Sequence, residues 1–183
     1  MRVYIAIDFD DNIKNYLEKI TSNIKNYCTE GSFTQKNNFH LTIRFIGEAD
    51  DTQISKIKEL LDMAVLNILP FELSANTLGI FKRKKTNILW MGIEENASLS
   101  ELHEELTILL NKYKIPFYNK LYIPHITLGR RILLNEDSAD LNSLISYERI
   151  KIPVKAISLM ASKEENGKLN GVSIYRVNLK ELR

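Results

Sequence analysis

The 183-residue sequence has little of several features that would point to a particular class of protein. A single cysteine, Cys28, excludes an internal disulfide and is typical of a protein that folds in a reducing compartment. No apolar run approaches the roughly 20 residues that a membrane-spanning helix needs. The opening segment MRVYIAIDFDDN turns acidic after one short apolar stretch, which argues against a signal peptide. We therefore expect a cytoplasmic protein.

An excess of one charge sign is also lacking. The 25 Lys and Arg residues nearly balance the 23 Asp and Glu residues, so the net charge is only +2. So small a net charge does not by itself predict nucleic-acid binding. A composition of 44% hydrophobic and 26% charged residues is typical of a globular protein. The length suits one domain, or two small lobes that share a core.

The order of the predicted elements repeats along the chain: strand, helix, strand, helix and then two strands. In the first copy these elements are a strand 2–9, a helix capped by Asp10 or Asp11, a strand 39–46, a helix 52–69 and strands 71–81 and 87–93. The second copy consists of the strand 87–93, a helix with a capping box at Ser98 and Glu101, a strand 122–129, a weaker helical stretch 138–147 and strands 154–163 and 171–179. No linker separates the copies, so we expect one domain, 1–183, made of two interleaved lobes.

Two histidines occupy the same place in the two copies. His40 and His125 are separated by 125 − 40 = 85 residues, and each is followed two positions later by a threonine, Thr42 or Thr127. In a strand, residues two apart point to the same face, so each histidine shares a face with its threonine. The third histidine, His103, stands alone among carboxylates on a predicted helix, and we expect it at the surface.

The residues around the histidines limit the chemistry. Zinc usually takes three or four ligands, and neither strand offers a Cys, Asp or Glu on the histidine face. There is no G-x-S-x-G motif for a serine nucleophile. Two imidazoles suit general acid–base catalysis near neutral pH, and the threonine hydroxyls can bond phosphate oxygens. The pattern favours metal-free displacement at phosphorus, with a cyclic phosphodiester as a plausible substrate.

Arginines follow both motifs. Arg44 has the strand parity of His40 and could therefore reach an anionic phosphate. Strict alternation from His125 puts Gly129, rather than Arg130, on the histidine face. We therefore expect either that the strand ends or bulges at Gly129, so that Arg130 can swing in, or that Arg131 contacts the phosphate instead.

The stretches HLTIRFIGE and PHITLGR resemble the paired H-x-T-x motifs of the 2H phosphoesterase superfamily, in particular its RNA 2′,3′-cyclic phosphodiesterases, also called 2′-5′ RNA ligases. The resemblance covers nearly the whole chain in order. It implies a bilobal α+β fold with pseudo-twofold symmetry, in which antiparallel sheets line a central groove and helices lie outside. It also implies hydrolysis of a 2′,3′-cyclic phosphate at an RNA 3′ end to a 2′-phosphomonoester, with no metal or other cofactor.

The resemblance carries specific roles to this sequence. It implies that His40 and His125 are catalytic and that Thr42, Thr127 and Arg130 bind substrate. Gly129 stands where a bulkier residue is common, which is expected to open the groove slightly.

Three further roles come from the residues themselves. Tyr122 and Phe45 are candidates for stacking on a base, with a core position as the alternative for each. The basic turn Lys82–Lys85 is a candidate RNA contact or a solvated hairpin tip. For the chemistry, our hypothesis is that His125 activates water and His40 protonates the leaving oxygen.

Other functions remain open at this point. A 2′-5′ RNA ligase would use the same site in reverse, and a 2′-5′ oligonucleotide phosphodiesterase or a non-catalytic RNA or nucleotide binder would keep the same groove. Binding a phosphate does not require two titratable groups, so the paired histidines favour an enzyme. We expect a monomer, because both halves of the site lie on one chain.

Overall fold

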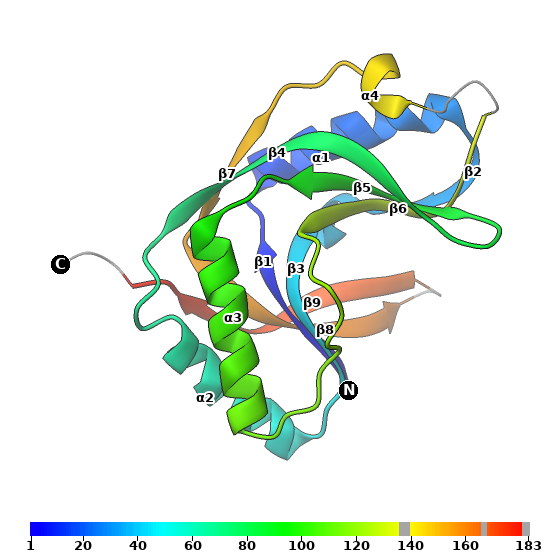
Figure 1. Ribbon diagram of the computed structural model, residues 1–183. Helices are drawn as coiled ribbons and strands as arrows, with labels where there is room; N and C mark the ends of the chain where they lie inside the picture. The colour runs from blue at the N-terminus through cyan, green and yellow to red at the C-terminus, as the bar shows by residue number, and fades with distance from the viewer. Residues whose placement is uncertain (136–139, 166–167, 181–183) are drawn as a thin grey trace.

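Residues 1–135, 140–165 and 168–180 are described by the structure, a computed structural model (Figure 1). Within them, nine strands form one sheet in the order β7-β4-β5-β6-β3-β1-β8-β9, with β2 paired to β6 off this path. All neighbouring strands are antiparallel. The strands are β1 (Arg2–Asp8), β2 (Cys28–Phe33), β3 (His40–Glu48), β4 (Phe71–Lys82), β5 (Asn87–Ile93), β6 (His125–Leu134), β7 (Ile150–Val154), β8 (Ala156–Glu165) and β9 (Lys168–Asn178).

Side-chain caps fix where the main helices begin. The helices are α1 (Asp11–Ile24), α2 (Asp51–Ala64), α3 (Ala97–Lys112) and the short α4 (Leu141–Leu144), with 3₁₀ turns at Lys25–Tyr27 and Lys36–Asn38. Asp10 caps α1 as predicted, and Asp50 caps α2 in a capping box with Gln53. Asn96, rather than the predicted Ser98, caps α3. In the described part of the chain, no helix has the length and apolar character needed to cross a membrane.

The sheet divides into two lobes where β6 meets β3. These strands share one bridging pair, Leu41 with Ile126. On one side of this junction β3 is followed by β1, β8 and β9, and on the other side β6 is followed by β5, β4 and β7. The first strand pairs with β8, so strands that are far apart in the sequence lie side by side in the same half of the sheet (Figure 1). About this junction β3 mirrors β6, β1 mirrors β5 and β8 mirrors β4, as the repeat predicts, whereas β9 mirrors β7, which the predicted repeat did not contain.

Two strands were not predicted, and each has a physical reason. β2 has the sequence CTEGSF and is mostly exposed, so it lacks the period-two pattern that marks a half-buried strand. β7 alternates buried and exposed residues, but Pro153 discourages a strand assignment; proline is tolerated here because β7 is an edge strand. The helical stretch predicted at 138–147 is reduced to α4, and its residues 138–139 lie outside the described part. The turn predicted at Asn166 also lies outside it.

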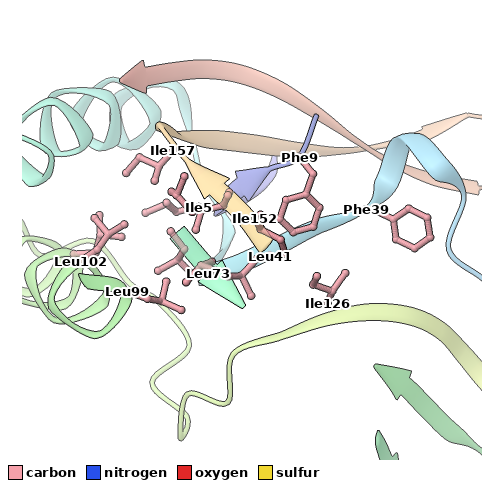
Figure 2. Packing of buried hydrophobic residues seen from close by; sticks show 14 of the residues in the cluster. Ile5, Phe9, Phe39, Leu41, Leu73, Leu99, Leu102, Ile126, Ile152 and Ile157 are labelled. Carbon is pink, nitrogen blue, oxygen red and sulfur yellow. The ribbon is translucent and has the colours of Figure 1, made fainter. Parts of the chain in front are cut away.

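One large apolar core joins the two lobes in the described part of the chain, and a small second cluster of Tyr4, Ala6 and Met160 lies apart from it. Figure 2 shows Leu41 of β3 and Ile126 of β6 pointing into the same cluster as Leu99 and Leu102 of α3. The helices cover this face of the sheet: α1 contacts β6, α2 contacts β8 and β9, and α3 contacts β3. Because the apolar residues of β3 and β6 point to this helical side, their alternate residues point to the other side. That other face carries the candidate site.

Candidate active site

The two H-x-T motifs form one four-residue cluster at the β3–β6 junction. Leu41 pairs with Ile126, so one step in either direction places His40 opposite Thr127, and Thr42 opposite His125. Residues opposite each other in an antiparallel pair share a face, and diagonal neighbours lie about 7–8 Å apart. The structure therefore places the two histidines diagonally across the junction, each beside the threonine of the other motif.

Each histidine is oriented by a backbone carbonyl two residues earlier. Nδ1 of His40 lies 2.8 Å from the carbonyl oxygen of Asn38, and Nδ1 of His125 lies 2.6 Å from that of Ile123. A carbonyl can only accept a hydrogen bond, so Nδ1 must carry the proton in both rings. This assignment follows from the bonding partner and leaves Nε2 of each histidine for a substrate. A neutral Nε2 can take a proton, and a protonated one can give it.

The charges near the two histidines differ. Burial lowers the pKa of His40, while the bond to Asn38 and the carboxylate of Asp8, its cross-strand neighbour on β1, raise it. Burial also lowers the pKa of His125, and the positive charge of Arg130 lowers the pKa of both. Asp8 is thus a negative charge that favours the protonated form of His40 and has no counterpart at His125 among the described groups. The two otherwise similar imidazoles are made electrostatically unequal.

The prediction that Arg44 shares a face with His40 and Thr42 is wrong, because β3 bulges. Along β1, Ala6 pairs with Thr42, but the next residue back, Ile5, pairs with Arg44. Two residues of β3 therefore lie opposite one residue of β1, so after Thr42 the side chains of β3 switch faces of the sheet. Arg44 points to the helical side of the sheet.

β6 bulges at the corresponding place, and there the bulge brings an arginine in. Trp90 pairs with Thr127 but Leu89 pairs with Gly129, so Leu128 is passed over. Gly129 faces the core and Arg130 emerges on the histidine face, which is the first of the two alternatives predicted from the sequence. Gly129 therefore does not open the groove.

The fit of Gly129 against the core explains the glycine. A Cβ there would lie 2.8 Å from Cδ1 of Ile132 and 3.3 Å from Cδ1 of Phe33, so a larger residue would require these two side chains to shift. Arg131, the other alternative, is exposed and has a φ of 56°.

The bulges make the two motifs equivalent beyond the threonine. Both strands show two consecutive buried residues at the third and fourth positions after the histidine, Ile43–Arg44 and Leu128–Gly129. The fifth position then returns to the histidine face, which is Phe45 in one strand and Arg130 in the other. Counting alternate residues along the sequence misses this shift. Two adjacent residues that are both suited to the buried face, such as Leu128–Gly129, are a weak signal of a bulge.

Aromatic side chains flank each histidine. The ring of Tyr4 lies 4.9 Å from the ring of His40. The ring of Phe45 stacks on that of Tyr4, with 6.4 Å between their centres. On the other side, the rings of Phe81 and Trp90 lie 5.0 and 6.3 Å from His125. Sequence reasoning identified Phe45 but missed the others, because only the strand pairing places them beside the histidines.

Tyr122 lies behind β3 rather than in front of it. Its hydroxyl donates to the backbone carbonyl of Thr42 at 3.3 Å, and its ring stacks on His103 at 4.0 Å with an interplanar angle of 8°. One face of the Tyr122 ring is therefore already covered, which argues against the predicted stacking on a base. His103 is half-buried in this contact and is not the surface residue that the sequence suggested.

Arg130 acts on both histidines, and two further arginines lie near Arg130. The pKa of Arg130 is lowered by burial and further by the positive charges of Arg2 and Arg83. The guanidinium of Arg2 lies 4.8 Å from the centre of the Phe45 ring. Arg83 comes from the predicted basic turn, which a hydrogen bond from its amide to the carbonyl of Thr86 closes. Clustered cations of this kind attract an anionic ligand.

A metal site was not expected from the sequence. Within residues 1–135, 140–165 and 168–180, no three His, Cys, Asp or Glu side chains lie together in a group that could hold a metal ion. The groups that the site offers are imidazole nitrogens, hydroxyls and guanidinium donors. These are suited to proton transfer and to holding a phosphate.

Comparisons with known proteins point to one family. The family model that matches residues 9–166 describes the 2′-5′ RNA ligase superfamily. The RNA 2′,3′-cyclic phosphodiesterase of Thermotoga maritima is 31% identical over 163 residues, which cover 88% of this chain and 87% of that protein. The enzyme of the same name from Aquifex aeolicus is 29% identical over 170 residues, covering 88% of each.

Solved structures share the fold. E. coli LigT complexed with 3′-AMP superposes with a TM-score of 0.79 at 21% identity and covers 98% of both chains. The protein TT0787 of Thermus thermophilus gives a TM-score of 0.78 at 19% identity, again over 98% of both chains. These similarities confirm the predicted α+β fold with antiparallel sheets and outer helices.

Proposed function

The chain belongs to the 2′-5′ RNA ligase superfamily, and we propose that it hydrolyses the 2′,3′-cyclic phosphate at RNA 3′ ends to a 2′-phosphomonoester without a metal ion. The observation that carries this proposal is the four-residue cluster at the β3–β6 junction. It presents two Nε2 atoms and two hydroxyls on one face. The names of the Thermotoga and Aquifex relatives support the same substrate.

The two histidines take opposite parts in the reaction. His125 Nε2 accepts a proton from a water molecule, whose oxygen attacks phosphorus. The bond from phosphorus to the 3′ oxygen breaks, and His40 Nε2 gives its proton to that oxygen. One water is consumed, a 3′-hydroxyl and a 2′-phosphomonoester form, and proton exchange with solvent resets the two rings. Asp8 supports His40 as the acid because its carboxylate favours the protonated imidazole.

The other groups hold the phosphate. Thr42 and Thr127 stand beside the imidazoles, where their hydroxyls can donate to the non-bridging oxygens. Arg130, whose charge acts on both histidines, offsets the negative charge that grows on those oxygens in the transition state. The aromatic groups beside each histidine give the nucleotide bases a surface to stack on, worth about 1–3 kcal/mol per base.

The test is an assay on a short RNA ending in a 2′,3′-cyclic phosphate, with EDTA present throughout. Hydrolysis should continue under chelation, and its rate constant should fall by about 10²–10⁴ in His40→Ala and in His125→Ala. Circular dichroism should show that both variants remain folded. Loss of activity on adding EDTA, or full activity in both variants, would contradict the proposal.

A ligase would use the same groups in reverse, and the assay can separate the two. An RNA with a 5′-hydroxyl is added in excess, and the products are resolved by length. Joined product that exceeds the hydrolysed product would favour the ligase reading. The cluster is complete within one chain, so we propose that the active species is a monomer, and activity per chain should not depend on protein concentration.

A further inference from the structure

Arg44 is a buried cation that has no ion-pair partner among the described residues. Its relative exposure is 6%. None of the ion pairs in the described part of the chain includes it, and its Nε donor is buried without a hydrogen-bond partner. A buried guanidinium that lacks an anion is costly to desolvate. The stacking of Arg44 on the ring of Phe117, at 5.0 Å, and its contact with Thr107 offset only part of this cost.

The guanidinium is held in place from α3. Nη2 of Arg44 donates to the hydroxyl oxygen of Thr107, and that hydroxyl donates in turn to the carbonyl of His103 at 2.7 Å. The single O–H of Thr107 is thereby used, and its oxygen fixes the orientation of Arg44 through Nη2. His103 contributes a second unpaired group, because its Nε2 is also buried without a partner. Burial and the charge of Arg44 lower the pKa of His103 to about 4, so the ring is neutral at pH 7.

These side chains line a shallow pocket of about 560 Å³ on the α3 side of β3. The pocket lies on the face opposite His40, so it is separate from the proposed active site. Its other walls are Ser100, Glu104, Ile108, Leu121 and Tyr122. Glu104 is exposed, so solvent screens the repulsion between its carboxylate and an anion in the pocket.

We infer that this pocket is a second anion site, which binds a small oxyanion of the phosphate class on Arg44 and His103. A phosphate would supply the negative charge and an acceptor for Arg44 Nε, and a second phosphate oxygen would accept from His103 in its Nε2–H tautomer. Guanidinium groups suit this role because they bind oxyanions through two parallel donors. The site differs from the catalytic one in its residues, in its face of the sheet and in requiring no proton transfer.

The experiment is a titration of the whole protein with inorganic phosphate at pH 7, followed by NMR at the Thr107 amide and the His103 ring. Both signals should shift and saturate. Arg44→Met should weaken this response about tenfold or more, because it removes the charged donor. Glu104→Gln is the matched control. It removes a negative charge from the pocket wall instead of a positive one, so it should tighten phosphate binding. A repeat titration with 5′-AMP distinguishes a site for free phosphate from one for a nucleotide phosphate.

The proposed active site can also bind phosphate, so the two must be separated. In Arg130→Met, the His40 and His125 signals should lose their response while those of Thr107 and His103 keep theirs. Thermal unfolding without phosphate checks that Arg44→Met is folded, and a melting temperature equal to or above that of the unmodified protein is expected. The inference is overturned if Thr107 and His103 do not respond, or if their response is the same in Arg44→Met.

Discussion

Asp8 is the residue that distinguishes two nearly identical motifs. On β1 it is the cross-strand partner of His40 on β3, and its carboxylate forms a salt bridge with Lys14 at 2.7 Å. Its carboxylate raises the pKa of His40, and the ammonium of Lys14 lowers it. An acid and a base built from the same side chain must differ in environment, and this pair of charges supplies the difference.

Replacing Asp8 should therefore change one histidine and not the other. In Asp8→Asn the pKa of His40 should fall, because the protonated form loses its negative neighbour, and the pKa of His125 should stay unchanged. If His40 acts as the acid, it must be protonated, so the fall of kcat/KM with rising pH should move to lower pH. NMR titration of both rings and a pH–rate profile measure the two effects.

Lys14→Met is the control for that change, since it removes the other member of the pair. The pKa of His40 should rise there, and the basic limb of the profile should move to higher pH. Equal shifts at His40 and His125 in Asp8→Asn would contradict the assignment of His40 as the acid.

Arg130 and Arg131 are adjacent in sequence, yet their expected roles differ. Arg130→Met should lower kcat/KM on the cyclic phosphate about 100-fold, because a donor to the transition-state phosphate is lost. Arg131→Met should change it by about twofold at most, because Arg131, unlike Arg130, is not among the charges that act on the two histidines. Steady-state kinetics of the two variants check this, and comparable losses would show that the bulge does not select between them.

At the scale of the elements, glycines allow aromatic rings to lie flat on β4 and β5. A Cβ at Gly79 would lie 2.2 Å from Cζ2 of Trp90, so the indole occupies the space that a side chain would fill. The same indole lies 6.3 Å from His125 and 5.1 Å from Phe81. Because Gly79 on β4 has no side chain, the Trp90 indole can lie close to His125 on β6.

Gly79→Val should displace the indole and lower kcat/KM about tenfold, with most of the loss in KM, because a stacked base is worth about 1–3 kcal/mol. Trp90 is the only tryptophan, so its emission reports the displacement directly. Thr77→Val, two residues earlier on the same strand and exposed, is the matched control. Unchanged emission and kinetics in Gly79→Val would disprove this packing effect.

At the scale of the molecule, the lobes meet through few backbone contacts but through a continuous core. The single bridging pair of Leu41 and Ile126 would be a weak link if backbone hydrogen bonds alone joined them. Both side chains are 0% exposed and belong to a cluster that includes strands and helices of both lobes. Unfolding one lobe would expose the inner face of the other.

The two lobes should therefore unfold together. Trp90 fluorescence reports the lobe of β5, and far-UV circular dichroism reports the whole chain, so their denaturant midpoints should coincide. Leu41→Ala should lower both midpoints equally, with a loss of about 2–5 kcal/mol in the free energy of unfolding. A Trp90 transition at a separate midpoint would show that the lobes are independent.

The sequence by itself determined the repeat and the chemical content of the site. Periodic apolar residues and helix caps are local, so they predicted most elements, and the matching H-x-T stretches predicted which residues would meet. The resemblance to the 2H phosphoesterase superfamily supplied the α+β fold.

Only the tertiary structure decided which way the flanking residues point. The parity of a strand holds until a partner strand forces a bulge, and pairing with β1 and β5 placed bulges after Thr42 and Thr127. That is why Arg130 faces the histidines and Arg44 faces α3, although strict alternation along each strand would point each of them to the opposite face. The partners of a strand are distant in sequence, so no local pattern could reveal them.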